Sequence, residues 1–436
     1  MINGITQDSF YRNLNFLKYP VLFFILLLVI QSCKKHPVLP RVTTNPPSEV
    51  TRTSVMAGGT ITDDGGLPVL DRGICWDTTE NPDLSKNFIQ ADTEDESFSI
   101  KITGLKPNTV YFIRAYATNE LGTTYANELT FTTLPVSTGT IVTIHPSSIS
   151  LRTALTGGKI IDDGDAVIIQ KGVCWSTSPN PDLEHDTFTE DGTGTEEFTS
   201  TITGLTPGTQ YFVRAYSINS AGISYGSELS FNTKISDIQN NLYSTVTIGS
   251  QVWMAENLRT TRYNDNSLIP NVKESSNWIN LSTPAYCWFG NDANKADWGA
   301  LYNWFTVQTG RLCPTGWHVP TDDDFKTLEL YLNLSPEQVG SWYWRGTDQG
   351  SRLKSTSGWD EGENGTNSSG FSALPYGYRF AGNGDFNGLG ILTYWWSSDY
   401  YDEYAIYRRI DGNESGIYRY ATSKKGGKYV RCIKTK

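Results

Sequence analysis

The sequence predicts a mainly β protein with a smaller α+β part, in which two tandem β-sandwiches precede an α+β domain. Three observations carry this prediction. One segment of roughly 100 residues, the usual length of a single sandwich domain, occurs twice along the chain. In each copy, short runs of alternating apolar and polar residues are separated by Gly, Pro, Asn and Asp, which is typical of strands joined by turns. Beyond residue 235 the composition changes, because 11 of the 13 Trp residues lie there.

The length and the net charge limit the number of domains and the kinds of partner. A chain of 436 residues is too long for one hydrophobic core, and about 150 residues per domain suggests three domains. The net charge of −11 disfavours a polyanionic partner, because phosphate binding needs clustered Lys and Arg, so we expect no nucleic-acid partner. The predicted segments are a signal peptide at 1–32, a tether at 33–40, sandwiches at 41–135 and 136–235, and the α+β domain at 236–436.

An export signal is predicted near the N-terminus. Residues 21–30 (VLFFILLLVI) form an apolar run that follows basic residues and is too short to span a bilayer. The run leads into the sequence IQSC, which resembles the lipobox of bacterial lipoproteins. This resemblance implies that Cys33 is lipidated on its thiol, that the chain is cleaved before it, and that its new amine is acylated. Several acyl chains would anchor the protein stably to a membrane.

The residue after Cys33 is Lys34 rather than Asp, and the resemblance to lipoprotein sorting signals then implies the outer membrane. We expect a cell-envelope protein that is held at the outer membrane by its N-terminal lipid and faces the cell surface or the periplasm. An ordinary secretory signal and an N-terminal anchor helix are the alternatives. Both alternatives also place the protein outside the cytoplasm.

The two copies of the repeat align over most of their length. GGTITDDGG at Gly58 matches GGKIIDDGD at Gly157, and ITGLKPNTVYFIRAY at Ile102 matches ITGLTPGTQYFVRAY at Ile202. The spacing between these motifs differs by a single residue, which places an insertion in a surface loop. Alternation along the second motif predicts a strand with one buried face in each copy.

The segments GLKPNTVY and GLTPGTQY resemble the tyrosine corner of fibronectin type III domains. The resemblance implies that Tyr111 and Tyr211 hydrogen-bond back across the corner of the sheet. Trp76 and Trp175 stand where an inward Trp would fill the space between two sheets. Neither copy has a recognisable catalytic group, and we expect both to act as spacers that hold the C-terminal domain away from the membrane.

Each copy contains a single Cys, Cys75 or Cys174, so neither residue can form a disulfide within its own domain. A small, buried and unreactive side chain is the favoured interpretation. Redox chemistry or pairing with another chain is the alternative.

The C-terminal segment carries a series of motifs in a fixed order, namely VTIGSQVWMAENLRTTRYNDNSLIP, PAYCWFGNDAN, GALYNWFTV, LCPTGWHVPTDDDFKTLELYL, GFSALPYGYR, YWWSSD and KYVRCIK. Together they resemble the Fib_succ_major paralogous domain over nearly all of residues 240–436, with Phe325 at a position where Trp is usual. The resemblance implies a C-type-lectin-like α+β fold, related to the sulfatase-modifying domain of formylglycine-generating enzymes. Such a resemblance predicts the fold better than the function.

One helix is predicted in this domain with particular clarity. Thr321 can cap its start, and the three Asp residues that follow place negative charge at the positive end of the helix. One face of the helix would carry four apolar residues, Phe325, Leu328, Tyr331 and Leu332. Most of the remaining segment alternates aromatic residues with Gly and Asn, which suits an irregular two-sheet fold.

Cys313 and Cys432 are predicted to form a disulfide in an oxidising envelope, joining the start of the domain's second half to its last strand. The closed loop of about 120 residues would stabilise the domain by roughly 3–5 kcal/mol. Cys287 has no adjacent cationic residue, so we expect a buried, inert thiol. Formylglycine-generating relatives act through reactive cysteines and bound copper, and a structural cysteine pair argues against transferring that chemistry to this chain.

Two further groups of polar residues are candidate sites. His318 is the only His of this domain, which excludes a multi-His zinc site and leaves it as the only base for a Ser-His-Asp triad. A hydrogen-bonded, partly buried imidazole is the favoured interpretation. An acidic loop supplies oxygen ligands of the kind that calcium takes: Asp360, Glu361, Glu363, Asn364 and Asn367. A solvated loop is favoured and a Ca²⁺ site is the alternative; no other cofactor is expected.

Trp residues in two short motifs are the candidate ligand-binding residues, because the apolar face of a sugar ring stacks on indole. The motifs are SWYW and WWSS, and the candidates are Trp342, Trp344, Trp395 and Trp396. Several Tyr residues accompany them in the sequence. Core packing is the competing interpretation, because Trp and Tyr also bury large areas in small β-rich domains.

These observations predict a non-catalytic envelope lipoprotein whose lectin-like domain binds an extracellular or periplasmic glycan or protein. An enzyme on a sulfatase-modifying scaffold and a purely structural envelope component are the alternatives. Copper retention and thiol reactivity would indicate the enzyme. Capture of envelope proteins, but not of glycans, would indicate the structural component.

Overall fold

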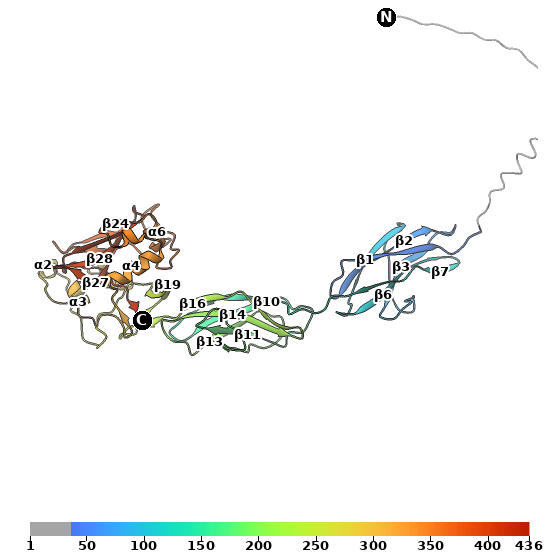
Figure 1. The fold of residues 1–436 in the computed structure, drawn as a ribbon, viewed down its shortest axis with the longest axis horizontal. Helices are drawn as coiled ribbons and strands as arrows, with labels where there is room; N and C mark the ends of the chain where they lie inside the picture. The colour runs from blue at the N-terminus through green and yellow to red at the C-terminus, as the bar shows by residue number, and fades with distance from the viewer. Residues whose placement is uncertain (1–35, 436) are drawn as a thin grey trace, which may run out of the picture. The chain divides into compact units, whose positions relative to one another are not determined.

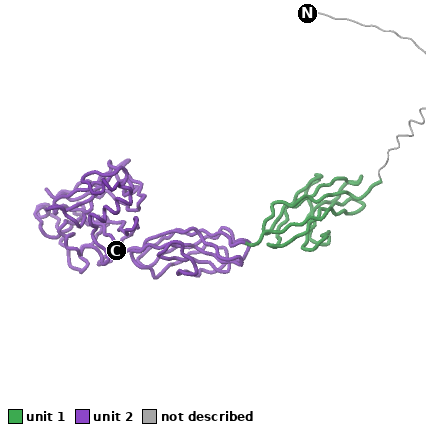
Figure 2. Tube along the Cα trace, viewed as in Figure 1, with its two compact units in different colours: residues 1–136 green, residues 137–436 purple. Residues whose placement is uncertain are grey.

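The computed structural model describes residues 36–435 (Figure 1). The predicted signal peptide and the predicted lipidation residue, Cys33, lie outside the described residues. The chain divides into two compact units, Met1–Val136 and Ser137–Lys436, and each is described by itself (Figure 2). Among residues 36–435, every helix is too short or too polar to cross a membrane.

The first unit contains one β-sandwich made of two antiparallel sheets. One sheet has the order β1-β2-β5, and the other has the order β4-β3-β6-β7 with β8 also paired to β6. The strands are β1 (Arg41–Ser48), β2 (Ser54–Asp63), β3 (Asp71–Asp77), β4 (Asn87–Gln90), β5 (Ser97–Thr103), β6 (Val110–Asn119), β7 (Gly122–Tyr125) and β8 (Leu129–Thr132).

The second unit begins with a sandwich of the same plan. Its sheets have the orders β13-β10-β9 and β12-β11-β14-β15, with β16 paired to β14. The strands are β9 (Thr140–Ser147), β10 (Ala154–Asp162), β11 (Gln170–Ser176), β12 (Thr187–Phe188), β13 (Phe198–Ile202), β14 (Gln210–Asn219), β15 (Gly222–Tyr225) and β16 (Leu229–Asn232). The shared plan confirms the tandem sandwiches predicted from the duplicated sequence.

Alternation along the strands builds the sandwich cores. In β6, Tyr111, Ile113 and Ala115 are buried between the sheets, whereas Phe112 and Arg114 on the other face are partly exposed. Successive residues of a strand point to opposite faces, so the alternation selects the side chains that lie between the sheets. Tyr116 is on the other face and is also buried.

Both tyrosine corners form as the resemblance implies. The hydroxyl of Tyr111 accepts a hydrogen bond of 2.9 Å from the backbone N–H of Lys106, and the hydroxyl of Tyr211 accepts one of 3.1 Å from that of Thr206. Each bond joins the start of a long strand to the turn before it. The fibronectin type III-like character of the two sandwiches is thereby confirmed.

The sandwich cysteines are buried thiols. Burial raises the pKa of Cys75 and of Cys174 to about 12, so both stay protonated at neutral pH. Trp175 is buried in the second core, and Trp76 packs partly buried against the first. These positions support the interpretation of both cysteines as core residues without redox function.

A six-stranded sheet of order β24-β29-β28-β27-β25-β26 is the centre of the C-terminal domain. Its strands are β24 (Tyr343–Arg345), β25 (Tyr376–Arg379), β26 (Phe386–Leu389), β27 (Leu392–Tyr401), β28 (Tyr404–Asp411) and β29 (Ile417–Thr422). A second sheet of order β19-β20-β30-β23 comprises β19 (Thr245–Ile248), β20 (Gln251–Met254), β30 (Ile433–Lys434) and β23 (Trp317–His318). Two short pairs complete the strands, β17 (Ile235–Ser236) with β18 (Leu242–Tyr243) and β21 (Tyr286–Cys287) with β22 (Leu301–Tyr302).

Short helices connect these strands. They are α2 (Ser275–Trp278), α3 (Trp304–Val307), α4 (Asp322–Tyr331), α5 (Pro336–Val339), α6 (Gln349–Leu353) and the 3₁₀ turns η1 (Phe289–Asn291) and η2 (Ala293–Trp298). Strands and long loops dominate, which confirms a mainly β chain with a smaller α+β part.

Helix α4 begins where its cap predicts. Thr321 and Asp324 form a reciprocal capping box, in which each side chain accepts a hydrogen bond from the backbone N–H of the other residue. Phe325 and Leu328 are buried as expected. Tyr331 was expected on the same face, but it is 60% exposed, because it ends the helix and lies over the backbone of Gly249.

Cys313 and Cys432 form the predicted disulfide, with a Cα–Cα distance of 5.9 Å. The bond joins the segment before β23 to the residue before β30, so it fastens the second sheet across a separation of 119 residues. Cys287 is completely buried, and burial raises the pKa of its thiol to about 12. Its predicted inertness is consistent with this environment.

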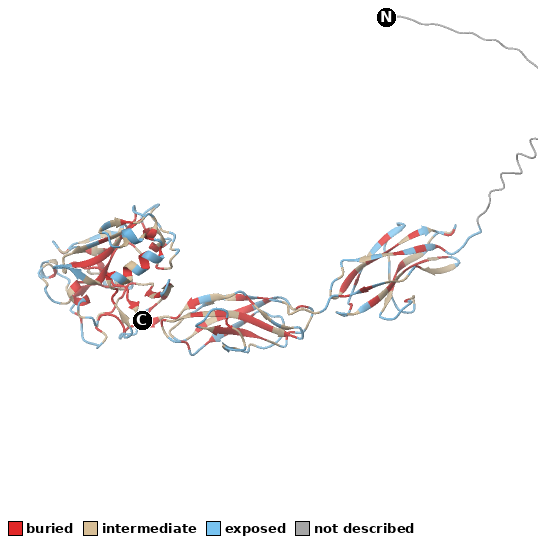
Figure 3. Ribbon diagram, viewed as in Figure 1, coloured by how far each residue is buried: buried red, intermediate tan, exposed pale blue. Residues whose placement is uncertain are grey.

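Two hydrophobic clusters form the core of the C-terminal domain, and β27 contributes to both. Figure 3 shows the buried residues of the described chain in red. Trp396 belongs to the cluster that also contains the disulfide cysteines. Its neighbour Trp395 belongs to the cluster that contains Phe325 and Leu328 of α4. The central sheet is therefore covered on both faces where these residues lie.

Candidate ligand-binding groove

A groove lined mainly by aromatic side chains opens at one end of the six-stranded sheet. Its volume is about 700 Å³, within the roughly 300–1,000 Å³ of typical ligand pockets. Its aromatic residues come from β24 and the residue before it, from the β27–β28 hairpin and from β29: Trp342, Tyr343, Tyr401, Tyr404 and Tyr420. The pairing of these strands brings together rings that lie far apart in the sequence.

The β27–β28 hairpin supplies the most exposed rings. Tyr401 and Tyr404 face each other across the end of the ladder and are 63% and 51% exposed. The two-residue turn between them consists of Asp402 and Glu403, both exposed, and Asp402 adopts a left-handed conformation with φ +55°. Asp402 also lines the groove, so a carboxylate stands beside the two tyrosine rings.

Tyr343 and Tyr420 form the second side of the groove. Their rings stack with centroids 5.0 Å apart and an interplanar angle of 26°. Tyr343 has φ +69°, a left-handed conformation that costs a bulky side chain about 1–3 kcal/mol and persists only where the surrounding structure holds it. Backbone of this kind is concentrated at ligand and active sites.

Trp342 lies between the two sides and is supported from behind. Its ring meets Tyr401 and Tyr420 edge-on, at centroid distances of 5.6 and 6.0 Å. The guanidinium carbon of Arg419 lies 3.9 Å from the centroid of the indole, a close cation–π contact. Arg419 itself is 6% exposed, so this contact fixes Trp342 against the interior of the domain.

Arg419 belongs to a buried ion network that joins α4 to the central sheet. Two of its nitrogens donate to Asp322 at 2.6 and 2.9 Å. Arg408 donates to Asp322 at 2.8 Å and to Glu329 at 2.6 Å. Arg345 donates to both carboxylate oxygens of Glu329, at 2.8 and 2.9 Å. Burial alone would raise the pKa of Asp322, but the hydrogen bonds from its two arginines lower it far below its usual range.

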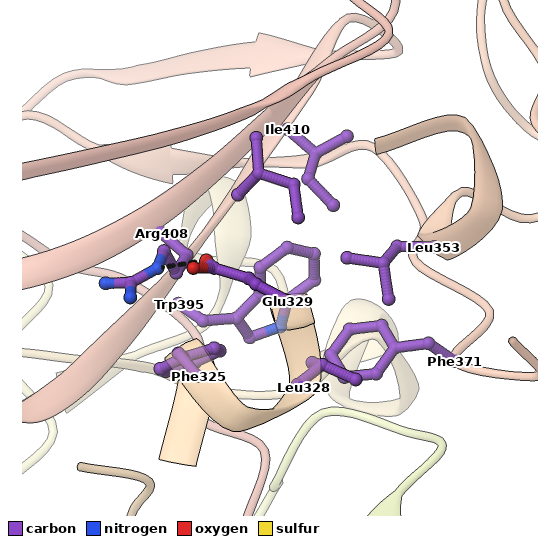
Figure 4. A pocket seen from close by; sticks show the side chains of 9 residues that line it. Phe325, Leu328, Glu329, Leu353, Phe371, Trp395, Arg408 and Ile410 are labelled. Carbon is purple, nitrogen blue, oxygen red and sulfur yellow. Dashed lines mark hydrogen bonds and ion pairs between the residues drawn. The ribbon is translucent and has the colours of Figure 1, made fainter. Parts of the chain in front are cut away.

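A small closed cavity lies beside this network (Figure 4). Figure 4 shows Glu329 joined to Arg408, with Trp395, Phe325 and Leu328 among the surrounding side chains. The cavity volume is about 10 Å³, which is about what one water molecule needs. It is part of the core packing, and it is too small for a ligand.

The prediction that Trp395 and Trp396 bind a ligand is wrong. Trp395 is 1% exposed and donates its indole N–H to the side-chain oxygen of Asn257 at 2.9 Å. Trp396 is fully buried and donates its indole N–H to the backbone oxygen of Tyr302 at 2.8 Å. Because β27 is an inner strand and both sheet faces are covered, two consecutive Trp residues both enter the core.

The other two candidate Trp residues have different environments. Trp342 lines the groove as described. Trp344 is partly buried, packs edge-on against Tyr418 at 5.1 Å and lies near the guanidinium of Arg409, so it is not a groove residue. The sequence analysis missed Tyr404 and Tyr420, whose signal is the alternation of Tyr in YAIYRR and IYRYAT.

The amide oxygens of the acidic loop take part in hydrogen bonds within the loop segment. Among residues 36–435, no group of three or more His, Cys, Asp or Glu side chains is placed to hold a metal ion, and the loop supplies three such carboxylates: Asp360, Glu361 and Glu363. The amide oxygens of Asn364 and Asn367 accept hydrogen bonds from backbone N–H groups of the same segment at 3.2 and 2.8 Å. The loop uses its amide oxygens to fix its own conformation, and the calcium alternative stays a prediction.

His318 is held by hydrogen bonds at both ring nitrogens. Nε2 lies 3.0 Å from Oδ2 of Asp324, and Nδ1 lies 3.2 Å from the hydroxyl of Thr435. Burial alone would raise the pKa of Asp324, but hydrogen bonds from His318 and Thr321 lower it to about 2. Because Asp324 also belongs to the capping box of α4, the arrangement ties β23 to the helix, and it supports the expected structural role for His318.

Lys428 is the most unusual titratable residue near the sheet. It is 4% exposed, and its amine lies 4.4 Å from the ring centroid of Trp396 and 4.8–4.9 Å from those of Tyr394 and Tyr407. Burial lowers the pKa of this amine to about 7. The aromatic surroundings make it part of the core beneath the sheet.

Comparison with known proteins agrees with the motifs of the C-terminal segment. The family described as the Fibrobacter succinogenes major domain (Fib_succ_major) matches residues 246–434. Over these residues the C-terminal domain is similar to the Fib_succ_major family, and its likeness to C-type lectins stays a prediction. No curated protein matches the chain.

Three solved structures are similar to parts of the chain. The FN1–FN3 domains of chicken CNTN1 are 11% identical, with 45% of this chain and 69% of that chain covered and a TM-score of 0.21. A segment of two fibronectin type III domains from chicken tenascin is 16% identical, with 44% and 96% covered and a TM-score of 0.26. The sensor domain of the anti-sigma factor RsgI4 from Pseudobacteroides cellulosolvens is 25% identical, with 22% and 96% covered and a TM-score of 0.18.

Proposed function

We propose that this chain is a non-catalytic lipoprotein of the bacterial cell envelope, in which two fibronectin type III-like spacers carry a Fib_succ_major domain that binds glycan. The aromatic groove is the observation that carries this proposal. Cys33 is the proposed point of lipid attachment to the outer membrane, and the glycan belongs to the cell surface or the periplasm. The duplicated sandwiches serve as the stalk.

The groove has the composition that sugar recognition needs. Tyr343, Tyr401 and Tyr404 are more than half exposed, although large aromatic side chains gain free energy by burial. The C–H face of a hexose is apolar and covers such rings, which removes their apolar area from water. Exposed, clustered rings on a folded domain therefore mark a binding surface rather than a packing defect.

Polar groups at the rim complete the site. Asp402 offers carboxylate oxygens as acceptors for sugar hydroxyls, and Thr422 and Ser423 line the same groove with hydroxyls that both donate and accept. A few polar groups around an apolar floor fix the orientation of a ligand, whereas the rings supply most of the contact area.

The cysteines support a non-catalytic role. Within residues 36–435, the three free thiols are buried, and burial raises the pKa of each to about 12. The remaining two cysteines are joined in the disulfide. Thiol chemistry of the kind used by formylglycine-generating enzymes needs a reactive thiolate, which none of these residues supplies.

A glycan array tests the proposal, with residues 36–436 as the wild type. The test variant carries Tyr401→Ala and Tyr404→Ala, because both rings are exposed and their removal leaves the core intact. Tyr331→Ala is the matched control, since Tyr331 is equally exposed but lies on α4, outside the groove. We expect wild type and control to bind the same glycans and the double variant to lose binding at least tenfold.

Two results would overturn the proposal. One is the absence of binding to any glycan by correctly folded protein. The other is a double variant that binds as well as the control. Capture of an envelope protein through Tyr401 and Tyr404, without any glycan binding, would replace the glycan with a protein ligand.

A further inference from the structure

We infer that the groove selects electrically neutral glycans and discriminates against acidic ones. The inference rests on the proposed function and adds the chemical class of the ligand. It follows from the carboxylates at the rim of the groove and from the nearby cations, which already contact other groups.

The rim of the groove repels anions. Asp402 is the one charged residue among the described residues that line it, and the exposed Glu403 follows in the same turn. An acidic sugar stacked on Tyr401 or Tyr404 would lie within a few ångströms of two carboxylates. This distance is shorter than the Debye length of about 8 Å at physiological salt, so the repulsion is not screened away.

The nearest cations cannot compensate for these carboxylates. Arg419 lies behind Trp342, but two of its nitrogens donate to Asp322 and the third donates to the backbone oxygen of Gly340 at 3.0 Å. Lys424 is adjacent to the groove residue Ser423, but its ammonium lies over the rings of Trp304 and Tyr400, neither of which lines the groove. Among the described residues, neither of these two cations is therefore free to pair with a carboxylate or sulfate on the ligand.

The test compares polymers of different charge on residues 36–436. Immobilised neutral polysaccharides (glucan, mannan, xylan and galactan) and polygalacturonate serve as probes, each at low and at high NaCl. We expect at least one neutral polymer to bind with an affinity that salt changes by less than about twofold, because no counterions are released. Polygalacturonate should bind at least about tenfold more weakly.

Glu403→Lys is the matched charge variant, because Glu403 is exposed and lies beside the groove without lining it. We expect this variant to gain affinity for polygalacturonate and to keep its affinity for the neutral polymer. Binding of polygalacturonate as tight as that of every neutral polymer, and lost in the Tyr401→Ala and Tyr404→Ala variant, would overturn the inference but leave the proposed function standing. Failure of every polymer to bind would remove both.

Discussion

Replacing Glu329 by Gln tests how strongly the buried ion network stabilises the C-terminal domain. Glu329 is 1% exposed, and its two oxygens accept from Arg345 and Arg408. Gln keeps the shape but removes the charge and one acceptor oxygen, so the buried guanidinium of Arg345 loses the only carboxylate partner it has among residues 36–435. Removing one member of a buried ion pair costs about 3–5 kcal/mol, and we expect the free energy of unfolding to fall by this amount.

Tryptophan fluorescence during urea unfolding measures this change, because 11 of the 13 Trp residues report on the C-terminal domain. The matched control is Asp323→Asn on the same helix. Asp323 pairs with Lys326 at 2.8 Å, but its side chain is 87% exposed, and such surface pairs contribute about 1 kcal/mol or less. If Glu329→Gln lowered the stability no more than this control does, the network would not carry the stability assigned to it.

Three further predictions concern pH and the disulfide. Asp322 and Asp324 both have lowered pKa values, and that of Asp324 is about 2. The stability that these carboxylates contribute is complete above their unfolded pKa near 4, and it is lost as the pH falls through the folded pKa values. Acid unfolding followed by fluorescence should begin in this window, and a domain stable well below pH 2 would contradict the prediction. Lys428 has a pKa lowered to about 7 against an ordinary value of 10.5, so the unfolded chain binds this proton more tightly, and the free energy of unfolding should rise with pH between about 7 and 10. The variant Lys428→Met should be more stable at neutral pH and should lose this rise. An unchanged dependence of stability on pH in the variant would refute the lowered pKa of Lys428. Replacing Cys313 and Cys432 by Ala should lower the free energy of unfolding by roughly 3–5 kcal/mol, given the separation of 119 residues; equal midpoints for the variant and the wild type under oxidising conditions would show that the bond contributes nothing.

Features encoded by local or repeated patterns could be predicted from the sequence. The sandwiches followed from a duplicated segment, and their tyrosine corners formed because Tyr111 and Tyr211 each bond to a backbone only five residues away. The start of α4 followed from the capping residues Thr321 and Asp324. The disulfide followed from counting the cysteines and placing Cys432 in the last strand.

The groove could not be predicted in the same way, because its residues meet only after four strands have paired. Trp342 and Tyr420 are 78 positions apart, and the order β24-β29-β28-β27 brings them together. The sequence also does not reveal which sheet faces are covered. Consecutive Trp residues necessarily point to opposite faces of a strand, and whether one of them is exposed depends on segments such as the loop of Asn257 and the β22 residue Tyr302.

The ion network and the groove are parts of one construction, because Arg419 belongs to both. Its bonds to Asp322 join it to α4, and its guanidinium fixes the indole of Trp342 from behind. The left-handed backbone of Tyr343 and the stacking of its ring on Tyr420 hold the next ring in place. Rings that are already fixed lose little conformational entropy when a ligand covers them, so more of the contact free energy appears as affinity. A groove with few polar groups can therefore still bind a neutral sugar, provided that the network behind it stays intact.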